Sequence, residues 1–516
     1  MKGALNRVPG LLPAIWLGCA GLGCEGPGGE RSPQTSSFGR PLATEVRPAL
    51  EAAVELYRRQ RGSALRLATD PNERLGGFIG AEALIQLADR GEWSSIFTLG
   101  DEAFEAELSG AQGLGRGPSP TPLPPEVRRI HDGDRGGLDA GSCRGCHAQG
   151  GADGSGTATQ VALFRGDGRH LSTATRRDAP ALLGLGYLSL VAREMEAELQ
   201  ARRATAIRDA SDLGRRVTAR LRAKGISFGE LSVEPDGTVD TSGVTGISSD
   251  LRVRPFGHKG RFAELVPLVD EALAVHLGVQ TASRLEAGAP GAHGDGPPAD
   301  PDDDGISFEA SNAQAVLMAT YLSLLPTPEI RPPRRADLAL SFARGRILLD
   351  TMLCTSCHRP VLRFDDYHLR VTGAGATPVS YVVDLEIAGL SPVPRALDLG
   401  PDDEGFAPGG TPLLLFSDLR RHEMGPELAE DSPELLPDGA GQVEGSVFLT
   451  RPLWGLADTA PYLHDGRALT IDEAIRAHGG EAVVSRDAYA QANDEDRGAV
   501  NVYLRSLTRA AELIVE

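Results

Sequence analysis

One pentapeptide, Cys-x-x-Cys-His, constrains this chain more than any other feature, and it occurs twice, at residues 143–147 and 354–358. In this pattern two thiols form thioether bonds to the vinyl groups of a haem, and the adjacent histidine is presented to the iron. Two copies use four of the six cysteines, which disfavours a zinc site, a redox dithiol or a structural disulfide. The sequence therefore predicts two covalently bound c-type haems, attached through Cys143, Cys146, Cys354 and Cys357, with His147 and His358 as proximal ligands.

The N-terminus has the pattern of an export signal. A lysine and an arginine precede a weakly apolar stretch, residues 8–23, which is too short and too often broken by Pro and Gly to span a membrane permanently. Cys19 and Cys24 each follow a Leu-Gly pair and are candidates for lipidation, although neither upstream tripeptide is a good match. We expect an exported protein, periplasmic or anchored as a lipoprotein; the alternative is a disordered leader with two incidental cysteines.

The charge balance bears on the choice of partner. Asp and Glu number 71 against 52 Lys and Arg, so the formal net charge is −19. This balance argues against nucleic acid or an anionic membrane surface and favours a basic electron-transfer partner. With 63 Gly, 36 Pro and only 5% aromatic residues, we expect long loops and an aliphatic core that a bulky cofactor helps to fill.

The order of parts repeats along the chain. Each motif is followed by a long stretch and then by an amphipathic helix with a Tyr-Leu core, expected at 313–325 and 496–507. Cytochrome c domains close with such a helix packed across an N-terminal one, and residues 338–353, before the second motif, are a candidate partner. We expect a mainly α fold with long loops, divided into a leader (1–25), a helical extension and linker (26–125), and cytochrome c-like domains at 126–330 and 331–516.

Three further segments carry a family resemblance. They are Arg-Asp-Ala-Pro-Ala-Leu-Leu-Gly-Leu-Gly at 177–186, Ser-Asp-Leu-Arg-Arg-His-Glu-Met-Gly at 417–425, and 451–467, where Arg-Pro-Leu-Trp-Gly-Leu leads into Thr-Ala-Pro-Tyr-Leu-His-Asp-Gly-Arg. With the two motifs, they make the chain from about residue 136 onward resemble the bacterial di-haem cytochrome c peroxidase superfamily, most closely its di-haem oxidoreductase branch. The resemblance implies reduction of hydrogen peroxide at the N-terminal haem, with electrons passed through the C-terminal haem. It also implies a small redox protein as donor, a basic cytochrome or a cupredoxin, and a homodimer.

The resemblance implies a second ligand for each iron. Relatives place a labile histidine ten residues before the proline of an Arg-Asn-Ala-Pro motif, and His170 stands ten residues before Pro180. Relatives place a methionine fourteen residues after the histidine of Tyr-x-His-Asp-Gly, whereas here His478 stands fourteen residues after His464. Imidazole in place of a thioether is expected to lower the potential of that haem. Met424 is the rival ligand.

A peroxidase also needs an acid/base that moves a proton between the two peroxide oxygens before their bond breaks. In relatives this group is a glutamate in a Glu-Met-Gly segment. The counterpart here is His276, followed by Leu-Gly, so the glutamate is replaced by an imidazole that can shuttle a proton near neutral pH. Glu194, which precedes a methionine, is the weaker alternative.

Members of the superfamily bind a calcium ion between the haems, and its protein ligands have counterparts in this sequence. The asparagine side chain and the two carbonyls that bind it correspond here to Asp178, Thr459 and Pro461. Aspartate in place of asparagine keeps an oxygen ligand and adds a negative charge, which suits calcium. Alternatively, Asp178 caps its segment or pairs with a neighbouring arginine.

The sequence leaves three functions open. The first is a peroxidase, in which His170 moves away from the first haem. The second is a non-catalytic electron-transfer protein whose haems stay six-coordinate through His170 and His478. The third is a di-haem oxidase or oxygenase that acts on another substrate, as some relatives do. The altered acid/base segment favours the last two.

Overall fold

The computed structural model describes residues 79–110, 113–115, 128–129, 133–136, 139–147, 162–164, 170–283, 309–374, 378–386, 410–437 and 439–509. The predicted leader, with Cys19 and Cys24, lies outside the described residues, as does most of the linker expected before the first motif. Within the described part of the chain, no helix has both the length and the apolar character needed to cross a membrane.

The helices around the first motif pack against a fully buried closing helix, α8. These elements are α3 (Ala81–Asp89), α4 (Trp93–Glu105), the short helix η3 (Cys143–Gly145), α6 (Leu265–Ala272), the π-helical turn η5 (Leu273–Leu277) and α8 (Asn312–Leu324). A capping box of Ser311 and Gln314 fixes the start of α8. Helices α4 and α8 cross at Gly100, where any Cβ would overlap Tyr321.

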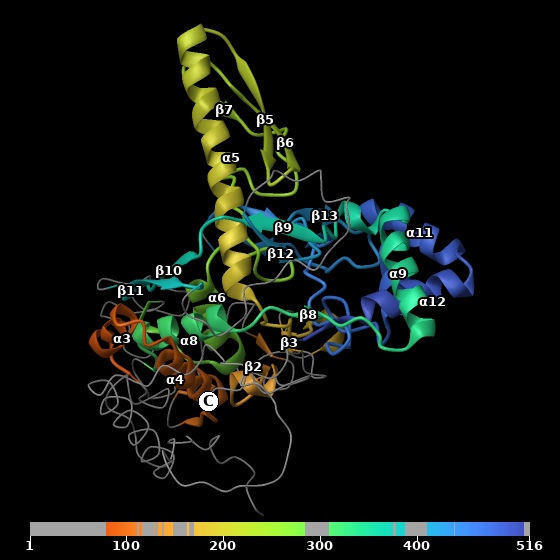
Figure 1. Ribbon diagram of the computed structural model, residues 1–516. Helices are drawn as coiled ribbons and strands as arrows, with labels where there is room; N and C mark the ends of the chain where they lie inside the picture. Colours follow the sequence, from red (N-terminus) through yellow and green to blue (C-terminus); the bar gives the residue numbers. More distant parts are fainter. Residues whose placement is uncertain are drawn as a thin grey trace, which may run out of the picture.

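The second motif lies within a separate helical group, seen at the right of Figure 1. It contains α9 (Ala336–Thr351), η6 (Cys354–Ser356), α10 (Ile471–Ala477), η8 (Gly480–Ala482), α11 (Val483–Gln491) and α12 (Asp494–Leu504). Helix α9 packs along α12, and a Cβ at Gly345 would overlap the carbonyl oxygen of Ala499 and lie 2.8 Å from Cβ of Tyr503. The expected closing helices and the helix before the second motif are therefore confirmed. In both groups a glycine of an early helix meets the tyrosine of the closing helix.

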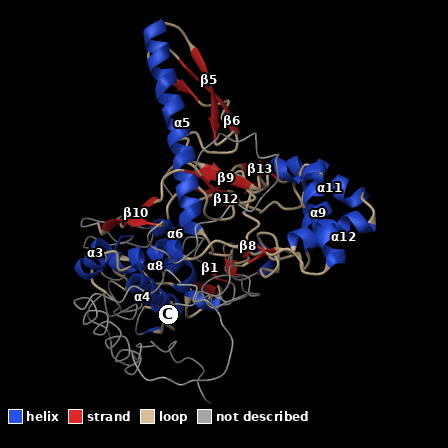
Figure 2. Cartoon of the chain, viewed as in Figure 1, coloured by secondary structure: helices blue, strands red, loops and turns tan. Residues whose placement is uncertain are grey.

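The expectation of a mainly α fold is wrong. Among the described residues 40% are helical and 18% lie in strands. The strands pair antiparallel in small sheets (Figure 2), some between neighbouring segments and some between segments far apart in the chain. The pairs are β9 (Val361–Phe364) with β12 (Thr411–Leu414), β10 (His368–Thr372) with β11 (Ser380–Asp384), β13 (Arg421–Glu423) with β16 (Val447–Leu449), β14 (Glu434–Leu435) with β15 (Gln442–Val443), and β8 (Glu329–Ile330) with β17 (Leu507–Thr508). The four-stranded sheet has the order β2 (Gly133–Gly136), β1 (Arg128–Arg129), β3 (Ala162–Phe164), β4 (Thr175–Arg177).

A long helix and a hairpin form an arm that projects from the body (Figure 1). Helix α5 (Leu185–Leu213) ends at Gly214, whose left-handed backbone closes the helix. Strands β5 (Val217–Ala223), β6 (Ile226–Val233) and β7 (Val239–Asp240) pack against its outer half. Lys224 and Gly225 both have positive φ, which suits the two-residue turn between β5 and β6.

Candidate functional site

The second motif opens onto a cavity of 340 Å³. Short helix η6 directs His358 into it, and Nδ1 of His358 donates a hydrogen bond to the carbonyl oxygen of Phe416 at 3.0 Å. Burial lowers the pKa of His358 to about 4, with His478 contributing to the shift. The imidazole is therefore neutral, and with its Nδ1 proton engaged the Nε2 lone pair is left for a metal.

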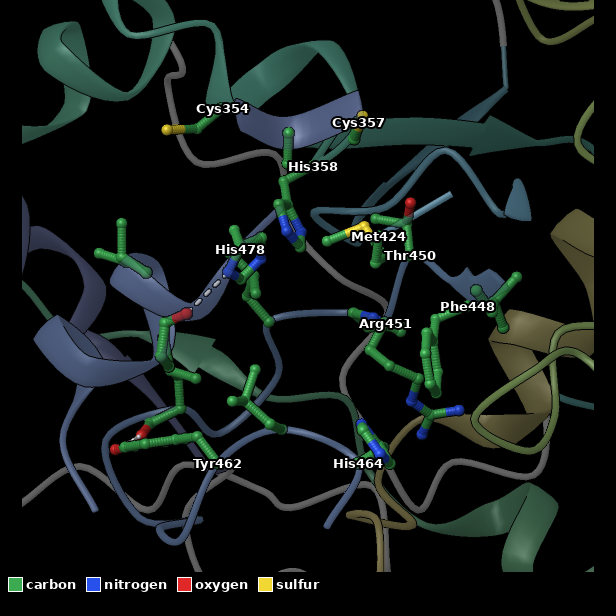
Figure 3. A pocket seen from close by; sticks show the side chains of 18 of the residues that line it. Cys354, Cys357, His358, Met424, Phe448, Thr450, Arg451, Tyr462, His464 and His478 are labelled. Carbon is green, nitrogen blue, oxygen red and sulfur yellow. Dashed lines mark hydrogen bonds between the residues drawn. The ribbon is translucent and has the colours of Figure 1, made fainter. Parts of the chain in front are cut away.

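A second imidazole faces the first across this cavity. The rings of His358 and His478 have centroids 6.4 Å apart, and both line the cavity (Figure 3). Nδ1 of His478, at the end of α10, donates to the carbonyl oxygen of Ala474 at 2.7 Å, so its Nε2 is also left as an acceptor. Two imidazoles bound to one metal at about 2 Å from each nitrogen have centroids about 6 Å apart. The pair thus fits the two faces of a single iron. Met424 lines the same cavity.

Three of the motif thiols, those of Cys143, Cys146 and Cys354, are held protonated. Burial raises the pKa of Cys143 to about 12 and those of Cys146 and Cys354 to about 11. Zinc binding and dithiol redox chemistry both use thiolates, which these environments disfavour. Addition of a thiol to a haem vinyl group does not require the thiolate. These cysteines therefore fit haem attachment better than zinc binding or dithiol redox chemistry.

A charged imidazole lies beside the second motif. His422 donates to Asp418 at 2.9 Å and to Glu481 at 2.7 Å, and its Nδ1 is 4.0 Å from Sγ of Cys357. Burial by itself lowers the pKa of His422, but the bonds with Asp418, Cys357 and Glu481 raise it to about 10. Ligand atoms of Cys357, Asp418 and His422 lie within 4.8 Å of one another, yet a protonated imidazole offers no lone pair to a metal.

The first motif has a similar proximal histidine. Burial, together with His276, lowers the pKa of His147 to about 4, although the backbone of Pro180 acts in the opposite direction. Nδ1 of His147 is buried without a hydrogen bond of normal geometry among the described residues. The ring of Phe104, from α4, lies 6.2 Å from the imidazole. The neutral ring again suits a proximal ligand.

His276 belongs to an Asp-His pair beside the first motif. Nδ1 of His276 donates to Oδ2 of Asp139 at 2.8 Å, and the backbone N–H of Asp139 donates to the His276 carbonyl at 2.8 Å. The histidine lies in π-helical turn η5, a local geometry often found at functional sites. Its side chain is 40% exposed, whereas that of Asp139 is 3% exposed. Sequence reasoning missed Asp139, although its position four residues before Cys143 was a usable signal.

Two other predicted catalytic residues make contacts of a different kind. His170 is exposed and precedes the short helix η4 (Leu171–Thr173), where its carbonyl accepts from the Thr173 hydroxyl at 2.8 Å. Glu194, on α5, pairs with Lys224 of the arm and accepts the backbone N–H groups of Asp365 and Asp366 at 2.7 and 2.9 Å. These contacts assign Glu194 to the base of the arm rather than to either motif.

The three residues predicted to bind calcium line the same cavity as His358. Backbone N–H of Asp178 donates to the His464 carbonyl at 2.8 Å, and the Asp178 carbonyl accepts from Nε2 of His258 at 3.0 Å. Its side-chain Oδ1 is buried without a hydrogen-bond partner in the described part of the chain. Burial raises the pKa of Asp178 to about 7, and electrostatic repulsion from Asp465 contributes to the rise. The hydrogen bond from the Ala179 N–H acts in the opposite direction. Asp178 therefore offers a buried carboxylate oxygen without a donor, in a cavity that Thr459 and Pro461 also line. Such an oxygen fits a cation.

The segment that contributes most of the residues lining this cavity is similar to a known protein family. Residues 395–507 match the family model "Di-haem oxidoreductase, putative peroxidase". The match supports the di-haem peroxidase branch. The family name indicates haem cofactors and oxidoreductase activity, and the matched span contains His422, Met424, His464 and His478. No curated protein matches the chain.

Trp454 lies in the span that matches the di-haem oxidoreductase family, and a hydrogen bond fixes its side chain. Its indole Nε1 donates to the carbonyl oxygen of Leu414, at the end of β12, at 2.6 Å, and its ring lines the cavity. The side chain is 8% exposed. It is packed as a core residue and also borders the cavity.

Buried ion pairs connect this part of the chain to the segment after the first motif. Arg177 pairs with Glu430 at 2.6 Å and with Glu434 at 2.8 Å. The fully buried Lys259 donates to the carbonyl oxygens of Glu444, Gly445 and Val447 at 2.6–3.0 Å and lies 3.7 Å from Glu430. Because these charges are mutually satisfied, they hold the segment at 177–178 firmly against the second unit.

Proposed function

We propose that this chain is a di-haem c-type oxidoreductase that reduces hydrogen peroxide at the haem of His147 and receives electrons through the haem of His358. The facing pair His358 and His478 carries the proposal. Two imidazole ligands close both faces of an iron, which suits electron transfer and excludes peroxide. The first motif instead has an Asp-His pair beside it, whose chemistry is proton transfer. Cys143, Cys146, Cys354 and Cys357 would form the thioether bonds.

The roles of the residues near the first motif follow from their contacts. The bound haem would supply the iron at which the O–O bond is cleaved and one of the two electrons. Asp139 fixes the tautomer of His276, because Nδ1 keeps its proton in the bond to the carboxylate. Nε2 of His276 would then accept the proton of the near peroxide oxygen and deliver it to the leaving oxygen. His170, on an exposed segment, is our candidate for the ligand that leaves the first iron.

The remaining expectations belong to the same proposal. We infer that calcium binds between the haems at Asp178, Thr459 and Pro461, supported by the buried, unpaired Asp178 Oδ1. The net charge of −19 supports a small basic redox protein as the electron donor. Export to the periplasm or a lipid anchor follows from the N-terminal pattern, and a homodimer from the resemblance.

Peroxide turnover of the full chain tests this function, with a reduced basic cytochrome as donor. His276→Gln should lower kcat by about 10²- to 10⁴-fold, the usual contribution of an acid/base group. His368→Gln is the matched control, because His368 is exposed and pairs with Asp366 at 2.7 Å. Full activity of His276→Gln would remove the acid/base assignment. Absence of peroxide consumption by the wild-type chain would favour the electron carrier.

A further inference from the structure

Arg451 is a cation that the proposed electron route does not use. It follows strand β16 and precedes Pro452, and it lines the cavity that also contains His358 and His478 (Figure 3). Burial lowers the pKa of its guanidinium to about 10, so the group is still charged at neutral pH. The chain thus places a permanent positive charge at the wall of the cavity.

This charge has no carboxylate partner in the described part of the chain. Its one hydrogen bond there is a long one, from Nη1 to the Gly257 carbonyl at 3.4 Å. Arg486 lines the same cavity but pairs with Asp487 at 2.8 Å, and Arg177 pairs with two glutamates. Arg451 therefore differs from its neighbours in being desolvated without a counter-ion. An unpaired buried charge is costly, which indicates that an anion completes the site.

We propose that Arg451 binds a propionate carboxylate of the haem attached at the second motif. This inference rests on one part of the proposed function, namely that a haem occupies this cavity. Such a haem brings its own carboxylates into the cavity that Arg451 lines. A guanidinium binds a carboxylate through two parallel N–H bonds, which a carbonyl at 3.4 Å does not provide. Arg451 is thus a positioning residue, which orients the haem and adds a positive charge beside it.

The reduction potential of the second haem tests this assignment. Reduction adds an electron, so loss of a nearby positive charge should disfavour it. We expect Arg451→Gln to lower the midpoint potential of the haem ligated by His358, and Arg451→Lys, which keeps the charge, to restore most of it. The measurement is a spectroelectrochemical titration of the full chain, with the second haem identified as the one whose low-spin signal is lost in His478→Gly.

Arg476→Gln is the control, because Arg476 is on the same helix as His478 but is exposed and pairs with Asp472 at 2.7 Å. It removes the same charge outside the cavity and should leave the potential near the wild-type value. A wild-type potential in Arg451→Gln would overturn the proposal, even if the variant is less stable. A saturable shift of the wild-type potential on adding acetate would also overturn it, because Arg451 would then be open to an external anion. A haem count of one per chain would instead refute the proposed function.

Discussion

At the scale of single residues, the second ligand of each haem matters most. The family resemblance implied that His478 stands at a ligand position, and the structure brings its ring to 6.4 Å from that of His358. The proximal histidines and the thiols were predicted from the motif alone, because covalent haem attachment demands a fixed local spacing, and these assignments stay predictions. The role of Arg451 was not readable, because the cavity that it lines is assembled only in three dimensions. The pairing of Asp139 with His276 likewise forms only in the folded chain, although the position of Asp139 near Cys143 was a usable signal.

Substitution of His478, the proposed second ligand of the His358 haem, gives a prediction about the reduction potential. His478→Met should raise the midpoint potential of the second haem, because a thioether favours the reduced iron, within the span of about 0.8 V that axial ligands cover. A potentiometric titration measures the change, with Met424→Leu as the comparison variant. If the potential moves in Met424→Leu and not in His478→Met, Met424 is the ligand.

The environment of Asp178 gives a prediction about calcium and pH. Calcium binds a carboxylate, and burial raises the pKa of Asp178 to about 7. Protonation below pH 7 therefore competes with the ion, so calcium affinity should fall from pH 8 to pH 6, with proton uptake when the ion leaves. Calorimetry at three pH values measures this, and Asp178→Asn should bind more weakly but without the pH dependence. Equal affinity at pH 6 and 8 would contradict the site.

At the scale of secondary-structure elements, two glycine contacts define the helical groups. Gly100 lets α4 approach Tyr321 of α8, and Gly345 lets α9 approach α12 at Tyr503. The helices were predictable because apolar periodicity is local to each. The strands were missed because most are only two to five residues long and give little periodic signal, and because some, such as β8 with β17, pair with distant segments. The hairpin of β5 and β6 was missed as well, although its alternation and the Lys224-Gly225 turn are visible in the sequence.

The α9–α12 crossing gives a prediction about stability. Gly345→Val places a side chain where the Ala499 carbonyl lies, so the free energy of unfolding should fall by about 1–3 kcal/mol or more. Gly498→Ala, on α12 with open space around its Cβ, is the control and should be neutral or stabilising by up to about 1 kcal/mol. Denaturant unfolding followed by circular dichroism compares the two. Equal stability would mean that the helices do not cross so closely.

At the scale of the whole molecule, the segment around Arg177 joins the two haem sites. Arg177 binds Glu430 and Glu434, Asp178 bonds to His464 and His258, and the Pro180 carbonyl acts on His147. Four residues, 177–180, thus connect the surroundings of His147 to the cavity of the second motif. No local sequence pattern encodes this network, because the partners of Arg177 and Asp178 come from segments about 80 and 250 residues further along the chain.

The division of roles between the two haems follows from this arrangement and is the central claim. Electron paramagnetic resonance of the half-reduced full chain, before and after addition of hydrogen peroxide, tests it most directly. We predict one low-spin haem with two imidazole ligands that is insensitive to peroxide and is lost in His478→Gly, and a second haem that becomes high-spin on half-reduction and reacts with peroxide. Two low-spin haems that remain unchanged by half-reduction and by peroxide would contradict the account.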